Sequence, residues 1–119
     1  MATVVVAVSD VFFLAKVHDA VKQAGAELKL ARTVEEGLAA AWAGADMVVV
    51  DLNDQGLAAL ELVGALRAEE AFGELPIVGF LSHVQVDLKA QAEEAGVTEV
   101  VARSVFSAKL PEILGRYVG

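Results

Sequence analysis

The chain has 119 residues, a net charge of −8 at pH 7 and no cysteine. A chain of this length is expected to form one domain, here over residues 1–119, and to bury roughly two thirds of its unfolded surface. The lack of cysteine excludes disulfides and thiolate metal sites. The acidic balance argues against nucleic-acid binding, which needs clustered Lys and Arg.

Hydrophobic residues make up 56% of the chain, and its mean hydropathy is +0.57. No apolar run approaches the roughly 20 residues that cross a bilayer. The first residues, Met1-Ala2-Thr3-Val4, contain no basic or cleavage-type segment. We therefore expect a cytoplasmic protein without membrane contact, in which the excess of apolar residues covers both faces of a central sheet.

Hydrophobic spacing predicts the first three elements. Residues 3–8 form a mainly apolar run rich in β-branched side chains that ends before Asp10, which is typical of a buried parallel strand. Apolar residues recur at helical intervals over 11–24, which predicts an amphipathic helix. Residues 27–31 alternate between polar and apolar, as expected for a half-exposed edge strand.

A capping-box pattern begins the next predicted helix. Thr33 and Glu36 can each satisfy a free amide at its first turn, and the helix reaches about Ala43. Trp42, the only tryptophan, is expected to cover the sheet; a binding role for it is the less favoured alternative.

The most informative segment is the apolar run over residues 47–50, which leads directly into Asp51. It predicts a strand buried on both faces that presents Asp51 at its carboxyl end, where open α/β sheets hold their ligands. On this segment alone, two interpretations of Asp51 are equally supported. It is a site residue, or it belongs to the polar turn over residues 51–54.

The rest of the chain continues the alternation of helix and strand. We predict helices over residues 57–71, 86–95 and 107–118, and strands over 75–81 and 99–102. A strand followed by a helix, repeated five times, requires parallel strands joined by right-handed crossovers. The predicted fold class is therefore α/β, a doubly wound sandwich around a five-stranded parallel sheet.

Several polar side chains are predicted to meet at the carboxyl edge of this sheet. Asp10 and Asp51 are expected within a few ångströms of each other, and two carboxylates with a loop carbonyl would suit Mg²⁺. Ser82 and Arg103 would add a hydroxyl and a cation for a phosphoryl group. Each also has a purely structural interpretation: Ser82 as a helix cap, Arg103 as the partner of an acidic neighbour, and His83 as a loop residue.

One set of residues forms a more specific pattern: Asp51-Leu52-Asn53, Leu60-Glu61-Leu62, Arg67 and Leu75-Pro76. With the five-unit order, this set resembles the receiver domain of bacterial response regulators, the family of the stand-alone chemotaxis regulator. The resemblance covers the whole chain and implies a flavodoxin-like sheet of order 2-1-3-4-5. It implies that Asp51 accepts a phosphoryl group from a kinase histidine and that Asp10, Asp51 and the carbonyl of Asn53 hold Mg²⁺.

The sequence departs from that family around the same pocket. The replacements are Ser9 for a second acid, Leu81 for the hydroxyl residue, Arg103 for a lysine, Ser104 for the proline after it, Val100 for the switch aromatic and Gln55 for a proline. Ser82 would point inward only after a one-residue slip of its strand. A trans peptide and a reshaped loop are expected at Ser104. We therefore expect an atypical receiver, or pseudo-receiver, with a weakened Mg²⁺ site.

The resulting functional hypothesis is a stand-alone signalling module of two-component (phosphorelay) type. It would act without enzymatic activity by binding partner proteins, as a monomer or weak dimer, with degenerate or weakened phosphorylation of Asp51. The resemblance places its contact surface on the last helix, the strand before it and the helix after Ser82. The first alternative is a receiver fully regulated by a histidine kinase.

Two further alternatives remain open. A flavodoxin-like small-molecule-binding protein is disfavoured because Ser9-Asp10-Val11-Phe12-Phe13 contains no phosphate-binding loop. A structural subunit would use Phe12 or Leu14 as an exposed anchor. Burial of both side chains under a loop is the favoured interpretation.

Overall fold

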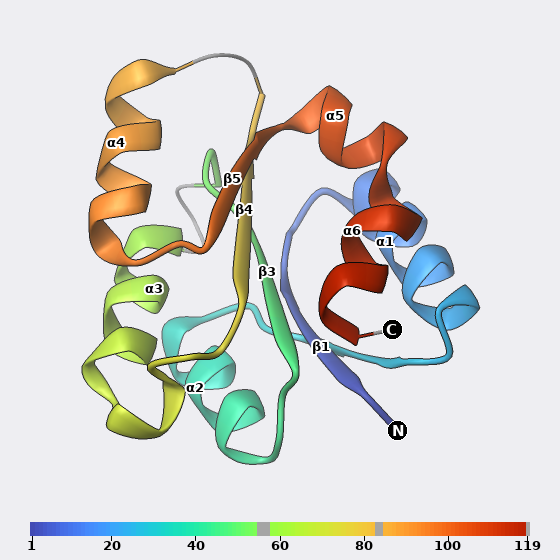
Figure 1. The fold of residues 1–119 in the computed structure, drawn as a ribbon, viewed down its shortest axis with the longest axis horizontal. Coiled ribbons are helices and arrows are strands. Elements are labelled where there is room, and N and C mark those ends of the chain that lie inside the picture. The colour runs from blue at the N-terminus through green and yellow to red at the C-terminus, as the bar shows by residue number, and fades with distance from the viewer. Residues whose placement is uncertain (55–57, 83–84, 119) are drawn as a thin grey trace.

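Five parallel strands form the sheet of this protein, with helices on both of its faces (Figure 1). The computed structural model describes residues 1–54, 58–82 and 85–118. The strands are β1 (Thr3–Ala7), β2 (Glu27–Leu30), β3 (Met47–Asp51), β4 (Ile77–Leu81) and β5 (Glu99–Ala102). The helices are α1 (Val11–Gln23), α2 (Val34–Trp42), α3 (Ala59–Ala68), the short 3-10 helix η2 (Glu70–Phe72), α4 (Val86–Ala95), α5 (Arg103–Ala108) and α6 (Leu110–Val118).

The strand order is β2-β1-β3-β4-β5, and every neighbouring pair is parallel. This order confirms the predicted doubly wound fold. Ala7 of β1 pairs with Val50, and Asp51 pairs with Phe80 of β4. The loops that leave β1, β3 and β4 therefore start at one edge of the sheet, which is the edge where the sequence places its polar residues.

The apolar runs of the strands supply two cores, one on each face. Val48 and Val50 pack in the core under α2, α3 and α4, while Val49 packs in the core under α1, α5 and α6. Figure 1 shows these two groups of helices on opposite sides of the sheet. Since successive side chains of a strand point to opposite faces, a central strand covered on both faces needs an unbroken apolar sequence.

The end of the chain differs from the prediction. The single helix predicted over residues 107–118 is wrong, because α5 ends at Ala108 and α6 begins at Leu110. Pro111 explains the break: it has no N–H to donate to the preceding turn and is tolerated only in the first turn of a helix. α5 starts directly after β5, at Arg103, and the Arg103–Ser104 peptide is trans as expected.

The prediction for Trp42 is also wrong. Its side chain is 58% exposed and packs against Phe72 of η2, with ring centroids 4.6 Å apart, instead of covering the sheet. Gly37 and Ala41 form the buried face of α2. Trp42 is one residue beyond Ala41 and is therefore turned about 100° away from that face.

Other boundaries differ by a few residues. The helix predicted over 57–71 is α3 followed by η2, and Leu57 lies outside the described residues. The strand predicted over 75–81 begins at Ile77. Within the part of the chain that the structure describes, no helix is long and apolar enough to cross a membrane.

Candidate functional site

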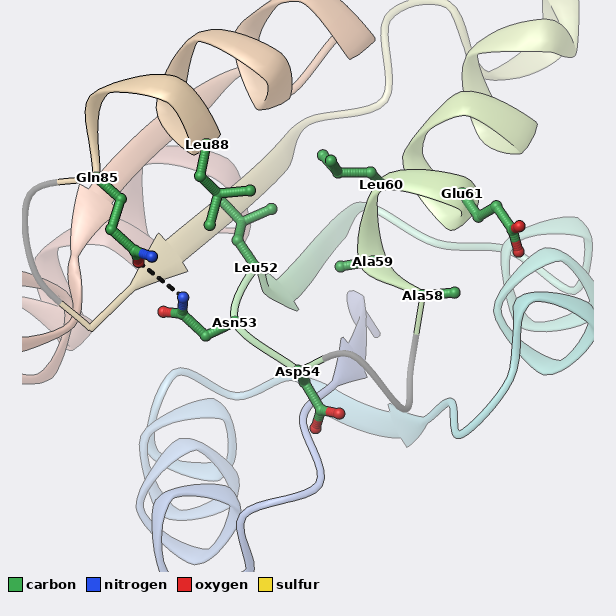
Figure 2. A pocket seen from close by; sticks show the side chains of 9 residues that line it. All are labelled: Leu52, Asn53, Asp54, Ala58, Ala59, Leu60, Glu61, Gln85 and Leu88. Carbon is green, nitrogen blue, oxygen red and sulfur yellow. Dashed lines mark hydrogen bonds between the residues drawn. The ribbon is translucent and has the colours of Figure 1, made fainter.

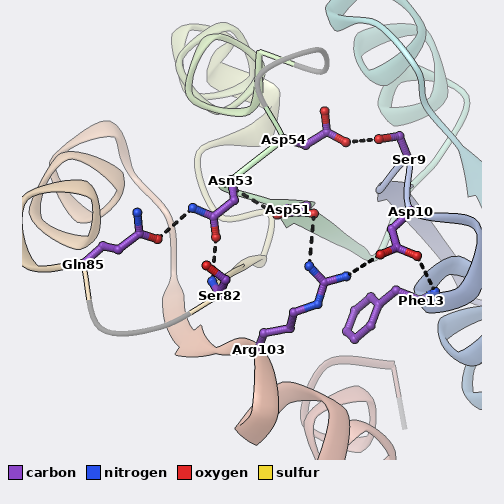
Figure 3. Close-up of polar contacts among 9 residues, drawn as sticks. All are labelled: Ser9, Asp10, Phe13, Asp51, Asn53, Asp54, Ser82, Gln85 and Arg103. Atoms are coloured by element: carbon purple, nitrogen blue, oxygen red, sulfur yellow. Dashed lines mark hydrogen bonds and ion pairs between the residues drawn. The ribbon is translucent and has the colours of Figure 1, made fainter.

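Asp51 ends β3 with its carboxylate at the carboxyl edge of the sheet. It is 5% exposed, and among the described residues it is the one charged residue that is buried. Its Oδ1 accepts the backbone N–H of Asn53 at 3.0 Å, and its Oδ2 lies 4.0 Å from Nη1 of Arg103 (Figure 3). Burial raises the pKa of Asp51, while the Asn53 amide and the Arg103 guanidinium act in the opposite direction.

Asp10 lies across the edge from Asp51 and has two partners. Its Oδ1 accepts the backbone N–H of Phe13 at 3.1 Å, which caps α1, and its Oδ2 accepts from Nη2 of Arg103 at 3.0 Å. The Phe13 amide first, and then the Arg103 charge, hold the pKa of Asp10 below its ordinary value, although desolvation opposes them. The pKa of Asp10 is therefore shifted in the opposite direction to that of Asp51.

Arg103 connects these two carboxylates. Its guanidinium carbon lies 4.4 Å from the centroid of the Phe13 ring and 5.6 Å from that of Phe80, within the range of a cation–π interaction. The structural interpretation of Arg103, a pair with an acidic neighbour, is thus confirmed. The structure also brings it to the predicted edge, between Asp10 and Asp51.

Asn53 joins the loop after β3 to the segment after β4. Its side-chain Nδ2 donates to Oε1 of Gln85 at 2.7 Å, and its Oδ1 accepts the backbone N–H of Ser82. The side chain of Asn53 is therefore occupied by these two contacts. The predicted use of its main-chain carbonyl as a metal ligand stays a prediction.

The position of Ser82 follows from the end of β4. Leu81 is the last residue of the strand; it pairs with Ala102 of β5 and is 3% exposed. Ser82 follows without a slip of the strand and is exposed, beside Asn53. Leu81 therefore holds the last strand position, and Ser82 lies at the start of the loop. His83 and Gln55 lie outside the described residues.

Sequence reasoning assigned no site role to Asp54 or Gln85. The hydroxyl of Ser9 donates to the carboxylate of Asp54, which joins the loops after β1 and β3. The signal for Asp54 was its place in the polar run that begins at Asp51. Gln85 precedes α4, and nothing in its local sequence distinguishes it from an ordinary loop residue.

These side chains line two neighbouring open cavities. One, of about 520 Å³, is lined by Ser9, Asp10, Asp51, Asn53, Asp54 and Arg103. The other, of about 440 Å³, is lined by Leu52, Asn53, Asp54, Ala58, Ala59, Leu60, Glu61, Gln85 and Leu88 (Figure 2). Asn53 and Asp54 belong to both, so the loop after β3 forms the border between an acidic cavity and a more apolar one.

The residues of the acidic cavity do not fit a divalent cation as they are arranged. The carboxylates of Asp10 and Asp51 each accept a backbone N–H, and the guanidinium of Arg103 lies between them. Among the described residues, no three or more His, Asp or Glu side chains are grouped so that they could hold a metal ion. Octahedral Mg²⁺ would need these same oxygens at about 2.1 Å.

Comparison with known proteins gives a consistent answer on the fold. No family model and no curated protein sequence matches the chain. Solved structures of response regulators do. The phosphorylated cyanobacterial phytochrome response regulator RcpA has a TM-score of 0.84 at 13% identity, covering 99% of this chain and 94% of its own.

Two other solved structures agree. The chemotaxis response regulator CheY4 of Vibrio cholerae has a TM-score of 0.84 at 23% identity and covers 98% of each chain. A response regulator protein from Burkholderia multivorans has a TM-score of 0.76 at 26% identity, covering 98% of this chain and 94% of its own. The protein therefore has the fold of response-regulator receiver domains, as the residues around Asp51 predicted.

Proposed function

We propose that this protein is a receiver-like signalling module that acts by binding partner proteins, with phosphorylation at Asp51 weaker than in a full receiver. The observation that carries the proposal is the position of Asp51. Its carboxylate ends the central strand of a receiver fold at the edge where Asp10 and Arg103 also lie. The same surroundings argue against efficient phosphorylation.

The charge of the acidic cavity opposes phosphoryl transfer. In the part of the chain that the structure describes, three carboxylates and one guanidinium line it. A transferring phosphoryl group carries negative charge on its oxygens, and neutralising that charge is most of the catalysis in phosphoryl transfer. Among the described lining residues Arg103 is the one cation, and it is already engaged with Asp10 at 3.0 Å. The expected consequence is slow modification of Asp51, even by an activated small donor.

Exposed apolar side chains support a role in protein binding. Six large hydrophobic residues among those described are exposed, and four of them lie near the starts of helices at the carboxyl edge. We call these four the apolar rim: Val11, Phe12, Val86 and Val105. Phe12 is 91% exposed, so the favoured interpretation of its burial was wrong, whereas Leu14 packs partly against the core.

The apolar rim agrees in part with the surface that the resemblance implies. Val86 begins α4, which is part of the expected surface. Val105 lies on α5, between β5 and the last helix, and so just outside that surface. Val11 and Phe12 begin α1, and they extend the apolar rim to the other side of the acidic cavity. Since the chain carries a net charge of −8, a partner with apolar side chains and basic groups is favoured.

The first test is chemical. The protein is incubated with Mg²⁺ and acetyl phosphate, or with beryllofluoride, and followed by intact mass and amide NMR shifts. We expect little or slow modification of the wild-type protein and none of Asp51→Asn. The control Asp19→Asn, on the exposed face of α1, should be modified as wild type is. Rapid, complete modification would overturn the weakened phosphorylation and favour the fully regulated receiver.

The second test concerns partner binding. Wild type, Phe12→Ser with Val105→Ser, and Lys22→Ser are immobilised at equal density, and proteins retained from the source cells are compared by mass spectrometry. A partner retained by wild type and Lys22→Ser but lost from the double variant supports the proposal. Identical retention by all three would remove the apolar rim as the binding surface.

A further inference from the structure

We infer that Arg103 is the built-in cation of the carboxyl edge: its guanidinium takes the place of a divalent metal between Asp10 and Asp51. The inference deepens the proposed function, because it rests on the receiver-like arrangement of these residues, and it concerns how the site is held together. As a consequence, both carboxylates are paired with Arg103 when no metal is present. The site binds a divalent cation only when the guanidinium is removed.

The contacts of the guanidinium carry this inference. Nη2 of Arg103 lies 3.0 Å from Oδ2 of Asp10, and Nη1 lies 4.0 Å from Oδ2 of Asp51. Two nitrogens of one planar fork thus face carboxylates that come from two different strand ends (Figure 3). A lysine ammonium is a compact point charge and could not direct two separate nitrogens at them.

An aromatic support holds the guanidinium in this position. The Phe13 ring lies 4.4 Å below it, and Phe13 in turn packs against Phe80 with centroids 4.8 Å apart. Phe80 stacks on Phe106 of α5 at 4.8 Å, and all three rings are at most 9% exposed. Moving Arg103 out of the site would therefore give up a cation–π contact as well as its ion pairs.

The local backbone fixes the same placement. Arg103 is the first residue of α5 and directly follows β5, so its Cα is held at the sheet edge by the strand on one side and the helix on the other. A cation tethered in this way is present at a high effective concentration, whereas a metal ion must arrive from solution. A divalent ion would also have to displace a guanidinium from the same carboxylate oxygens that it needs.

Removal of the guanidinium should allow a divalent metal ion to bind between these carboxylates. Asp10, Asp51 and Asp54 would then line the cavity with no cation among the described lining residues. Mg²⁺ keeps several waters and is bound through only one or two protein carboxylates, so the oxygens of Asp10 and Asp51 that the guanidinium releases would be suitable ligands for Mg²⁺ or Mn²⁺. Arg103→Met is the appropriate change, because it keeps an apolar stem over the Phe13 ring while removing the charge.

The test is a Mn²⁺ titration followed by paramagnetic broadening of backbone amide signals, with Mg²⁺ as competitor. Wild type, Arg103→Met and Arg116→Met are compared; Arg116 pairs with Glu99 at 2.7 Å, away from this cavity, and serves as the matched control. We expect broadening at Asn53 and Asp54 in Arg103→Met at Mn²⁺ concentrations at least about tenfold lower than in wild type or Arg116→Met, which corresponds to 1.4 kcal/mol or more.

Two results would overturn the inference. One is equal broadening of these amides in wild type and Arg103→Met, which would mean that Arg103 does not compete with metal. The other is no site-specific broadening in a folded Arg103→Met, which would mean that the carboxylates form no cation site at all. Phosphorylation and partner retention play no part in this readout, so failure of the proposed function would leave it unchanged.

A second measurement does not use Arg103→Met and therefore remains decisive if that variant does not fold. A cation that binds the folded state but not the unfolded chain raises the melting temperature, and the rise increases with the concentration of the cation relative to its dissociation constant. We expect the same melting temperature in Mg²⁺ as in a monovalent salt of equal ionic strength. A Mg²⁺-specific rise that disappears in Asp51→Asn would overturn the inference.

Discussion

Arg103 rests on Phe13, with its guanidinium carbon 4.4 Å from the centroid of the ring, so a charged residue of the site is supported directly by the core. Phe13 is 9% exposed, whereas the preceding residue, Phe12, is 91% exposed. Two consecutive phenylalanines of α1 thus face opposite environments. The core and the outer surface of this helix can therefore be perturbed separately by substituting one ring or the other.

Phe13→Ala is expected to lower the free energy of unfolding by about 3–5 kcal/mol, because it removes a buried ring and leaves a cavity. Phe12→Ala should change it by less than about 0.5 kcal/mol, because the ring is already in water. Urea unfolding followed by circular dichroism measures both. Equal losses from the two substitutions would contradict the orientation of α1.

Asp51→Asn is expected to stabilise the protein near neutral pH, where the buried carboxylate is charged. Burial raises the pKa of Asp51 above the value of the unfolded chain, so the folded state holds more protons between the two pKa values. The free energy of unfolding therefore falls as pH rises through that window, and the full cost of the buried charge is present above it. An amide has no such cost.

The pH dependence provides the check on this prediction. The advantage of Asp51→Asn over wild type should be largest at neutral pH and should shrink as the pH is lowered toward the pKa of the unfolded chain. Thermal unfolding at a series of pH values measures it. An advantage that stays constant with pH would show that the charge is not its cause, and Asp19→Asn serves as an exposed control.

Gly79→Ala is expected to cost about 1–2 kcal/mol of stability through overpacking. A Cβ at this position of β4 would lie 2.9 Å from Cδ1 and 3.1 Å from Cγ of Leu52, the residue that follows Asp51. The amide signal of Asn53 should shift as the loop adjusts. Gly64→Ala is the matched control: it lies inside α3 with nothing within 4 Å of the new Cβ, and should stabilise by about 0.5–1 kcal/mol.

Arg67→Lys is expected to lower stability by about 1–3 kcal/mol. The guanidinium donates from Nε to the carbonyl of Gly96 at 2.9 Å, from Nη1 to that of Phe72 at 2.6 Å, and from Nη2 to Oγ1 of Thr98 at 3.2 Å. One ammonium cannot reach all three acceptors. Amide hydrogen exchange should accelerate at residues 96–98. An unchanged exchange rate there would contradict the stabilisation of this segment by the hydrogen bonds of Arg67.

The sequence was most informative where one local pattern decides the structure. The apolar run before Asp51 favours a strand buried on both faces, because it is short and three of its four residues are β-branched. The strand and helix alternation then limits the topology, and Asp51 follows at the carboxyl edge. None of these steps depends on the identity of a distant residue.

The parts that sequence reasoning missed depend on pairs of residues far apart in the chain. Arg103 was expected either to supply a cation for a phosphoryl group or to pair with an acidic neighbour, but the sequence did not say which acid. Its partner Asp10 lies 93 positions away, and no local pattern records their 3.0 Å contact. The same holds for Trp42, whose partner Phe72 lies on another element. Pro111, in contrast, carried a local signal for the helix break that the hydrophobic spacing concealed.

Asn53 links Asp51 at the carboxyl edge to the segment that leads into α4. Its backbone N–H donates to Asp51 while its side chain contacts Ser82 and Gln85 at the approach to α4. A change in the charge of Asp51 and a displacement of α4 therefore act on one and the same residue. Because coupling between sites is reciprocal, a protein whose binding displaced α4 would shift the pKa of Asp51 by the same free energy that protonation of Asp51 would contribute to that protein's binding.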